Sequence, residues 1–240
     1  MKTCVTTYSF RSCISSGRLT LLECIQKTRE MGFDGIEFVS FTPPEGIVLK
    51  EYINILRDTC AKNELEIVNY TIGGDFLNGS KGSIDDEIAR LKGEADIASA
   101  LGASGMRHDL TSGFAKGARG WRGFEDVLPR LAKGCWEVTE YAAGLGVRTM
   151  IENHGFFSQD SERIEKLVNT VAHDNFGLLV DMGNFLCVDE DPVTAVSRVA
   201  PYAFHVHAKD FHVKSGSGPN PGQGFFESRG GNFLRGDPVF

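Results

Sequence analysis

The chain has 240 residues, of which 41% are hydrophobic and 24% are charged, and these proportions are ordinary for a globular protein. Its net charge of −7 and isoelectric point near 5.4 argue against a surface that neutralises nucleic-acid phosphates. No apolar run reaches the roughly 20 residues of a membrane-spanning helix, and the six scattered cysteines include no CxxC pair. We therefore expect a cytoplasmic protein that acts on a small molecule, with neither nucleic acid nor membrane as a partner.

Short apolar or β-branched runs alternate with longer helical patterns along the chain. Strands are expected over residues 4–9, 35–39, 65–72, 105–110, 147–153, 176–181 and 203–209. Helices are expected over residues 20–31, 52–61, 83–100, 124–143, 161–170 and 192–199. Sustained alternation of this kind indicates a parallel sheet.

Three helix-to-strand junctions repeat one pattern, an apolar residue followed by glycine, at Gly32, Gly102 and Gly146. Glycine accepts the left-handed conformation that ends a helix, so the chain can turn directly into the next strand. An open doubly wound sheet would show the same alternation, but no GxGxxG motif follows the first strand. We favour the α/β class and a TIM (β/α)₈-type barrel.

The last part of the chain departs from this pattern. After residue 210 comes a tract rich in Gly, Ser and Pro, and we expect residues 211–240 to form a long irregular tail after the seventh strand. The chain then reads as a single incomplete barrel domain, 1–240, with seven strands present and the eighth β/α unit missing. Unpaired edges on the first and seventh strands predict a homo-oligomer, or a tail that covers the gap.

Ionisable residues end three consecutive strands: Glu152 the fifth, Asp181 the sixth and His207 the seventh. The carboxyl ends of parallel strands lie on one face, so these residues can converge although they are far apart in sequence. Two carboxylates and an imidazole suit a divalent cation. Each also has a structural interpretation: Glu152 as an ion-pair partner of Arg148 or Lys209, Asp181 as the cap of a turn, His207 as a hydrogen-bonded core residue. Three such residues at consecutive strand ends favour a site.

The motifs IENHG, DMGNF, HVHAKD and GFDGIEF make the chain resemble the xylose-isomerase-like barrel superfamily of sugar phosphate isomerases and epimerases. In that family a Glu, an Asp, a His and a second Glu, after strands five to eight, hold the metal. The resemblance implies that Glu152, Asp181 and His207 are ligands, while the fourth has no counterpart here. Mn²⁺ is the expected ion, with Mg²⁺, Co²⁺ and Zn²⁺ as alternatives.

The resemblance implies an isomerase or epimerase that acts on a sugar or sugar phosphate through an enediolate. Glu152 would then also be a catalytic base, whereas the opposing glutamate is missing, so the activity is expected to be impaired. Four further residues are candidates to bind substrate: Arg107, His108, His154 and Asn184.

Two other interpretations remain open. A metal-dependent, AP-endonuclease-like DNA-repair barrel shares the fold, but it needs more histidines and a basic surface. A non-catalytic fragment is the other alternative, because of the missing eighth unit.

Overall fold

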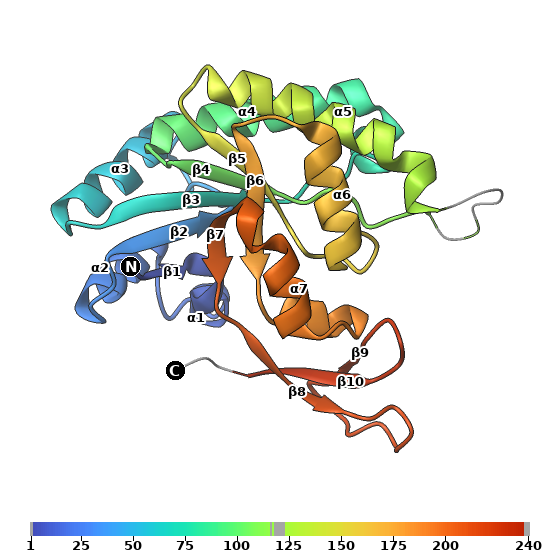
Figure 1. Ribbon diagram of the computed structural model, residues 1–240. Helices are drawn as coiled ribbons and strands as arrows, with labels where there is room; N and C mark the ends of the chain where they lie inside the picture. Colours follow the sequence, from blue (N-terminus) through green and yellow to red (C-terminus); the bar gives the residue numbers. More distant parts are fainter. Residues whose placement is uncertain (1, 116, 118–122, 238–240) are drawn as a thin grey trace. The chain divides into compact units, whose positions relative to one another are not determined.

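The computed structural model describes residues 2–115, 117 and 123–237, and Figure 1 traces its alternating strands and helices. Seven strands form one sheet in the order of the chain: β1 (Cys4–Thr6), β2 (Gly35–Val39), β3 (Glu66–Ile72), β4 (Gly105–His108), β5 (Arg148–Glu152), β6 (Phe176–Asp181) and β7 (Ala203–His207). The pairings β1–β2, β2–β3, β3–β4 and β6–β7 are parallel. The predicted seven strands of an α/β barrel are confirmed. The first is shorter than expected, because a 3₁₀ turn begins at Thr7.

Helices connect these strands, and all but the first, which was not predicted, lie at the predicted places. They are α1 (Arg11–Ser15), α2 (Leu21–Glu30), α3 (Leu49–Lys62), α4 (Ile84–Leu101), α5 (Phe124–Ala143), α6 (Ser161–Val171) and α7 (Pro192–Val199). Four 3₁₀ turns are also present among the described residues: η1 (Thr7–Phe10), η2 (Gly79–Gly82), η3 (Asn184–Val188) and η4 (Ala200–Tyr202). Gly32, Gly102 and Gly146 have φ angles of +85°, +78° and +74°, as their predicted place at the helix ends requires.

Two compact units share the chain, and each is assembled from separate segments. The first comprises residues 1–73, 89–108 and 140–149, and the second comprises 74–88, 109–139 and 150–240. That the whole chain behaves as one domain stays a prediction. No helix among the described residues is long and apolar enough to cross a membrane.

In the first unit, strand β2 lies in the core. Ile36 and Phe38 are fully buried, and Phe41 packs edge-on against Phe38 and Tyr70. Burying a side chain of this size stabilises a fold by about 1.5–3 kcal/mol. Helix α2 begins with a capping box, in which Thr20 and Glu23 each accept from the other's backbone N–H.

In the second unit, β6 and β7 pack closely and position the ends of both strands. A Cβ atom on Gly177 would lie 2.7 Å from the ring of Phe204, so glycine allows the two strands to approach. All six residues of β6 are buried, ending with Asp181. The pairing register sets Asp181 directly beside His207. Two ionisable residues are thus brought together by the register of the sheet.

The segment after β7 is not irregular, contrary to the expectation for residues 211–240. It forms a three-stranded antiparallel sheet of β8 (Asp210–Lys214), β9 (Phe226–Glu227) and β10 (Phe233–Asp237) in the order β8-β10-β9 (Figure 1). Phe211 and Leu234 form a buried cluster with Cys187 of η3, and this burial orders the segment. The Gly/Ser/Pro tract is the loop between β8 and β9.

Candidate metal centre

The ends of β5, β6 and β7 bring Glu152, Asp181 and His207 together. One ligand atom from each lies within 4.8 Å of the other two. Ligand atoms bound to one cation at about 2.0–2.6 Å lie roughly 3–5 Å apart, so this spacing matches a shared ion. Glu152 is 8% exposed and Asp181 is 2% exposed, whereas His207 is half-buried. The predicted convergence of these three residues is observed.

Asp181 is held rigidly by hydrogen bonds from its neighbours. Its Oδ1 accepts from the backbone N–H groups of Gly183 and Asn184, both at 3.0 Å. The Asn153 amide also brackets the backbone of Asp181, donating to its carbonyl at 2.8 Å and accepting from its N–H at 2.9 Å. Asp181 therefore does cap the turn, as the structural interpretation required. The same contacts fix the orientation of its carboxylate within the cluster.

The turn after β6 passes very close to the end of β7. A Cβ atom on Gly183 would lie 2.5 Å from the carbonyl oxygen of Lys209, a distance that side chains do not tolerate. Only glycine at this position lets the two chain segments approach so closely. Met182 N–H also donates to the carbonyl of His207 at 3.2 Å. The short distance between Asp181 and His207 thus depends on glycine at position 183.

Asn184 bridges the cluster and a lysine. Its Nδ2 donates to Glu152 Oε1 at 2.9 Å, and its Oδ1 accepts from Lys209 Nζ at 2.8 Å. Asn184 is fully buried, and its backbone carbonyl accepts from Gln159 Nε2 at 2.5 Å. Binding of a substrate hydroxyl by Asn184 stays a prediction. In the structure this residue orients the Glu152 carboxylate.

The cluster sets two buried carboxylates, Glu152 and Asp181, close together. Burial raises the pKa of Asp181, and the neighbouring Glu152 carboxylate raises it further, while Lys209 and His207 oppose the shift. Lys209 Nζ lies 3.8 Å from Asp181 Oδ2 and is 40% exposed, so it offsets the two buried carboxylates only in part. Two buried carboxylates and an imidazole are ligands that suit a divalent cation. The donor set therefore fits a metal ion.

His154 lies on the loop that follows β5. Its Nδ1 is 3.1 Å from Asp109 Oδ1, and half of its side chain is exposed. Next to it, Gly155 and Phe156 have φ angles of +85° and +65°. The exposed ring is available to a ligand, and its role toward substrate stays a prediction.

Arg107 and His108 lie on β4 in the first unit, and both are buried. Arg107 Nη1 donates to the carbonyl of Ile72 at 3.2 Å, a contact that supports the adjacent strand. Their assignment to the substrate stays a prediction.

Comparison with known proteins places the chain in a family. The sequence model described as "Xylose isomerase-like TIM barrel" matches residues 25–237. The chain belongs to the xylose isomerase-like TIM barrel family. This membership agrees with the predicted resemblance, and it accounts for the strand order that brings Glu152, Asp181 and His207 together.

One relative within this broad class is the inosose dehydratase of Lacticaseibacillus casei. It is 30% identical over 87 residues, which is 36% of this chain and 29% of that protein. The match thus spans less than a third of the relative's length. The match indicates shared ancestry for the 87 aligned residues, and it does not establish the activity of this chain.

Several solved structures share the fold. A probable 3-DHS dehydratase, AsbF, from Bacillus anthracis gives a TM-score of 0.71 at 19% identity, covering 90% of this chain and 74% of its own. A D-psicose 3-epimerase from Clostridium cellulolyticum H10, solved with D-tagatose, gives 0.69 at 15% identity, with coverages of 86% and 72%. A xylose isomerase-like barrel from Mycobacterium smegmatis, solved in complex with magnesium, gives 0.66 at 17% identity, with coverages of 90% and 72%. At these identities the likeness concerns the xylose isomerase-like fold alone.

Sequence reasoning missed two residues that support the cluster, Asn153 and Gln159, and it named Lys209 as an ion-pair partner of Glu152 but not as the neighbour of Asp181 and Asn184 that the structure shows. Asn153 directly follows Glu152, and Lys209 lies two positions after His207 along the extended chain. For Lys209 that spacing was a usable signal, because alternate residues of an extended segment share a face. Gln159 gave no signal, since it lies in a loop seven positions beyond Glu152.

Proposed function

We propose that this chain is a divalent-metal-dependent isomerase or epimerase that acts on a sugar or sugar phosphate. The reaction begins with removal of the proton on the carbon next to the carbonyl and proceeds through an enediolate. The convergence of Glu152, Asp181 and His207 within 4.8 Å is the observation that carries this proposal. Membership of the xylose isomerase-like family supports it.

Glu152 has two roles in this scheme, as a ligand and as a base. Asn184 fixes the carboxylate through Oε1, and burial separates it from bulk water. A positioned base of this kind contributes about 10²–10⁴-fold to the rate of proton transfer. A bound divalent cation, with Mn²⁺ expected and Mg²⁺, Co²⁺ or Zn²⁺ as alternatives, supplies Lewis-acid polarisation of the carbonyl. His154 and Asn184 are proposed to contact the oxygens of the substrate.

A dehydratase is a second candidate, favoured by the 30% identical inosose dehydratase segment. The first step is the same removal of an α-proton by a carboxylate. The C–O bond at the β-carbon then breaks, the hydroxyl leaves with a proton as water, and a C=C bond forms beside the carbonyl. The two reactions differ only after the proton has been removed.

The remaining interpretations receive less support. A DNA-repair nuclease is disfavoured by the net charge of −7. A non-catalytic role is an outcome of the test below. A homo-oligomer and a cytoplasmic location stay predictions, and light scattering of the purified protein measures the first.

Proton exchange with solvent tests the first step directly. The purified protein, loaded with Mn²⁺, is incubated in D₂O with ketoses, ketose phosphates, inosose and 3-DHS. We expect NMR to show deuterium replacing hydrogen next to the carbonyl of at least one compound. Products that keep every oxygen indicate an isomerase or epimerase, whereas an absorbing enone indicates a dehydratase.

Glu152→Gln is the matched variant, because it keeps the shape of the side chain and removes the base. Glu87→Gln is the control: Glu87 is also buried, but its carboxylate accepts from Asp75 N–H and Ser80 in a loop. We expect exchange to fall about 10²–10⁴-fold in Glu152→Gln and to persist in Glu87→Gln. Absence of exchange from every compound, or equal exchange in wild type and Glu152→Gln, would exclude the proposed reaction.

A further inference from the structure

The turn between β9 and β10, residues 228–232, is fastened to Asp189. The Asp189 carboxylate accepts from Ser228 Oγ at 2.6 Å, from Asn232 Nδ2 at 2.7 Å and from Gly230 N–H at 2.5 Å. A Cβ atom on Gly230 would lie 2.7 Å from that carboxylate, so a side chain at this position would displace it. Arg229 N–H also donates to the Cys187 carbonyl at 2.8 Å. These contacts therefore fix the backbone of the turn at Arg229.

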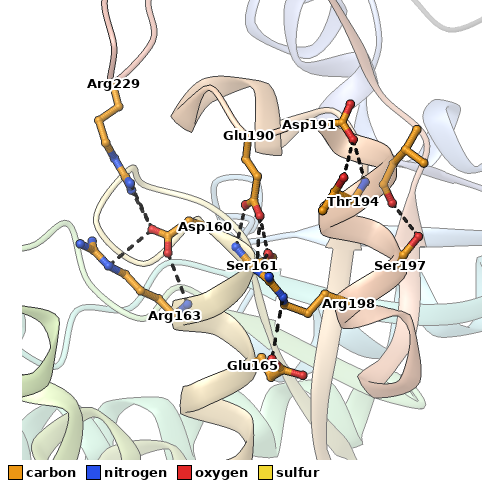
Figure 2. A network of polar contacts seen from close by, with 11 residues as sticks. Asp160, Ser161, Arg163, Glu165, Glu190, Asp191, Thr194, Ser197, Arg198 and Arg229 are labelled. Atoms are coloured by element: carbon orange, nitrogen blue, oxygen red, sulfur yellow. Dashed lines mark hydrogen bonds and ion pairs between the residues drawn. The ribbon is translucent and has the colours of Figure 1, made fainter.

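The Arg229 side chain reaches the loop between β5 and α6. Both of its terminal nitrogens lie 3.1 Å from Asp160 Oδ2, and Nη2 also donates to the carbonyl of Phe156. Figure 2 shows Arg229 and Arg163 meeting at Asp160, where α6 begins. Asp160 is the N-cap of that helix. Arg229 thus binds a backbone carbonyl and a capping carboxylate of the loop that follows Glu152.

A continuous set of hydrogen bonds leads from this loop to Glu152. Phe156 N–H donates to Gln159 Oε1 at 2.7 Å, and Gln159 Nε2 donates to the backbone carbonyl of Asn184 at 2.5 Å. Asn184 Nδ2 in turn donates to Glu152 Oε1 at 2.9 Å. Gln159 and Asn184 are both fully buried, so water does not compete with these bonds. The orientation of Glu152 therefore depends on where the backbone of Phe156 lies.

The backbone of Phe156 needs such support. Its φ of +65° is a conformation that a non-glycine residue rarely adopts. Persistence of this conformation requires contacts that over-determine it. Arg229 binds the carbonyl of this residue and Gln159 binds its N–H.

We propose that Arg229 is a positioning residue for the candidate metal centre. It holds the loop at residues 153–160 in the conformation that orients Glu152, although it is not itself a ligand. The sheet of β8, β9 and β10 then contributes to the site, because its β9–β10 turn carries Arg229. This inference rests on the proposed function for its effect on catalysis, whereas its effect on the loop is independent of it.

Arg198 offers a matched control for a substitution of Arg229. The two side chains have similar exposed fractions, 34% for Arg198 and 38% for Arg229. Arg198 donates to Ser161 Oγ at 2.6 Å and lies 3.7 Å from Glu190 and 4.0 Å from Glu165, which ties α6 to α7 (Figure 2). None of these contacts is with residues 153–159.

The experiment compares Arg229→Met, Arg229→Lys and Arg198→Met in the full chain. Hydrogen exchange measured by mass spectrometry, without metal or substrate, reports on residues 153–160. We expect exchange there to be about fivefold faster or more in Arg229→Met, partly restored in Arg229→Lys, and unchanged in Arg198→Met. Wild-type protection of this loop in Arg229→Met would overturn the proposal.

Metal titration and kinetics test whether the effect reaches Glu152. We expect Mn²⁺ affinity to fall about tenfold and kcat to fall more than KM rises in Arg229→Met, with wild-type values in Arg198→Met. Should Arg229→Met not fold, Asp160→Asn breaks the same ion pair while keeping an N-cap oxygen. A wild-type protein that binds no metal refutes the proposed function, while the exchange result still decides the role of Arg229. A loosened loop with wild-type Mn²⁺ affinity would refute the link to Glu152.

Discussion

Asp181 and Asp189 lie eight positions apart, yet their surroundings act on the carboxylate in opposite directions. Asp181 is buried beside a second carboxylate, and burial raises its pKa. Around Asp189, hydrogen bonds from Ser228, Asn232 and Gly230 outweigh the effect of burial and lower its pKa. The fold therefore disfavours charge at Asp181 and favours it at Asp189. The surroundings of Asp181 suit a metal ligand, because a bound cation would stabilise its charged form. The surroundings of Asp189 suit a residue that holds a turn in place.

The comparison shows how to separate a functional carboxylate from a structural one. The Asp181 carboxylate accepts two hydrogen bonds and the Asp189 carboxylate accepts three, so hydrogen bonding by itself does not mark either residue as functional. The difference lies in the net charge around each group and in its access to water. The free energy of unfolding of the Asp→Asn variants measures this difference directly, because asparagine keeps the shape of aspartate and removes its charge.

The largest expected effect appears when Asp181→Asn and Asp189→Asn are compared for both Mn²⁺ affinity and free energy of unfolding. We expect Asp181→Asn to lose Mn²⁺ binding, with affinity at least 100-fold lower, and to be as stable as wild type or more stable without metal. We expect Asp189→Asn to bind Mn²⁺ normally and to lose about 1 kcal/mol of unfolding free energy, because its bonds are partly solvent-exposed.

Urea unfolding in the presence of a chelator and calorimetric metal titration measure the two quantities. Asparagine also tolerates the φ of +60° at position 189, so backbone strain does not confuse the result. Destabilisation of both variants by similar amounts would show that the two sites do not differ in the way described.

A smaller effect is expected from Lys209, whose charge competes with a bound cation. Its Nζ lies 3.8 Å from Asp181 Oδ2, so its removal leaves a more negative site. At this separation unit charges interact by a few kcal/mol near a protein surface, and the 40% exposure of the lysine reduces this further. We expect Lys209→Met to bind Mn²⁺ about three- to tenfold more tightly.

Lys214→Met is the control for Lys209→Met. Lys214 is an exposed lysine of β8 that lies over the ring of Phe225, 5.9 Å from its centroid. Its removal changes the net charge equally but should leave Mn²⁺ affinity within about twofold of wild type. Weaker binding by Lys209→Met would instead mean that the lysine holds Asn184 and the cluster in place.

The smallest effect concerns pH and the turn at Asp189. The folded-state pKa of Asp189 lies below its ordinary value of 3.8, so its stabilising contribution is full above that value. The contribution is lost as the pH falls through the folded-state pKa. We expect the stability difference between wild type and Asp189→Asn to be constant from pH 7 to about 5 and to shrink below pH 4. Urea midpoints across this range measure it, and a difference that grows on acidification would contradict the assignment.

The alternating pattern of the sequence was sufficient to predict the seven strands and the three residues of the cluster. Parallel strands have long apolar runs, and Glu152, Asp181 and His207 interrupt or end them with charge. The glycines at positions 32, 102 and 146 marked the helix ends, because positive φ angles select glycine strongly.

The β8–β10 sheet could not be predicted in the same way. Its strands are short and carry exposed charged residues, and the intervening tract is rich in Gly, Ser and Pro. Its order comes from distant contacts: Phe211 and Leu234 pack on Cys187, and Asp189 binds the turn. A local pattern does not encode such contacts, which is also why the role of Gln159 emerged only from the structure.

The close approach of Gly183 to the Lys209 carbonyl has a consequence for protein engineering. A library that randomises the residues around the cluster, to change metal or substrate preference, should leave position 183 unaltered. Even alanine there would place its Cβ 2.5 Å from that oxygen and force the ends of β6 and β7 apart. Position 154, whose side chain is half exposed and whose φ is not positive, can accept new residues without moving either strand end. Diversity introduced at position 154 is therefore expected to yield folded variants far more often than diversity introduced at the turn after β6.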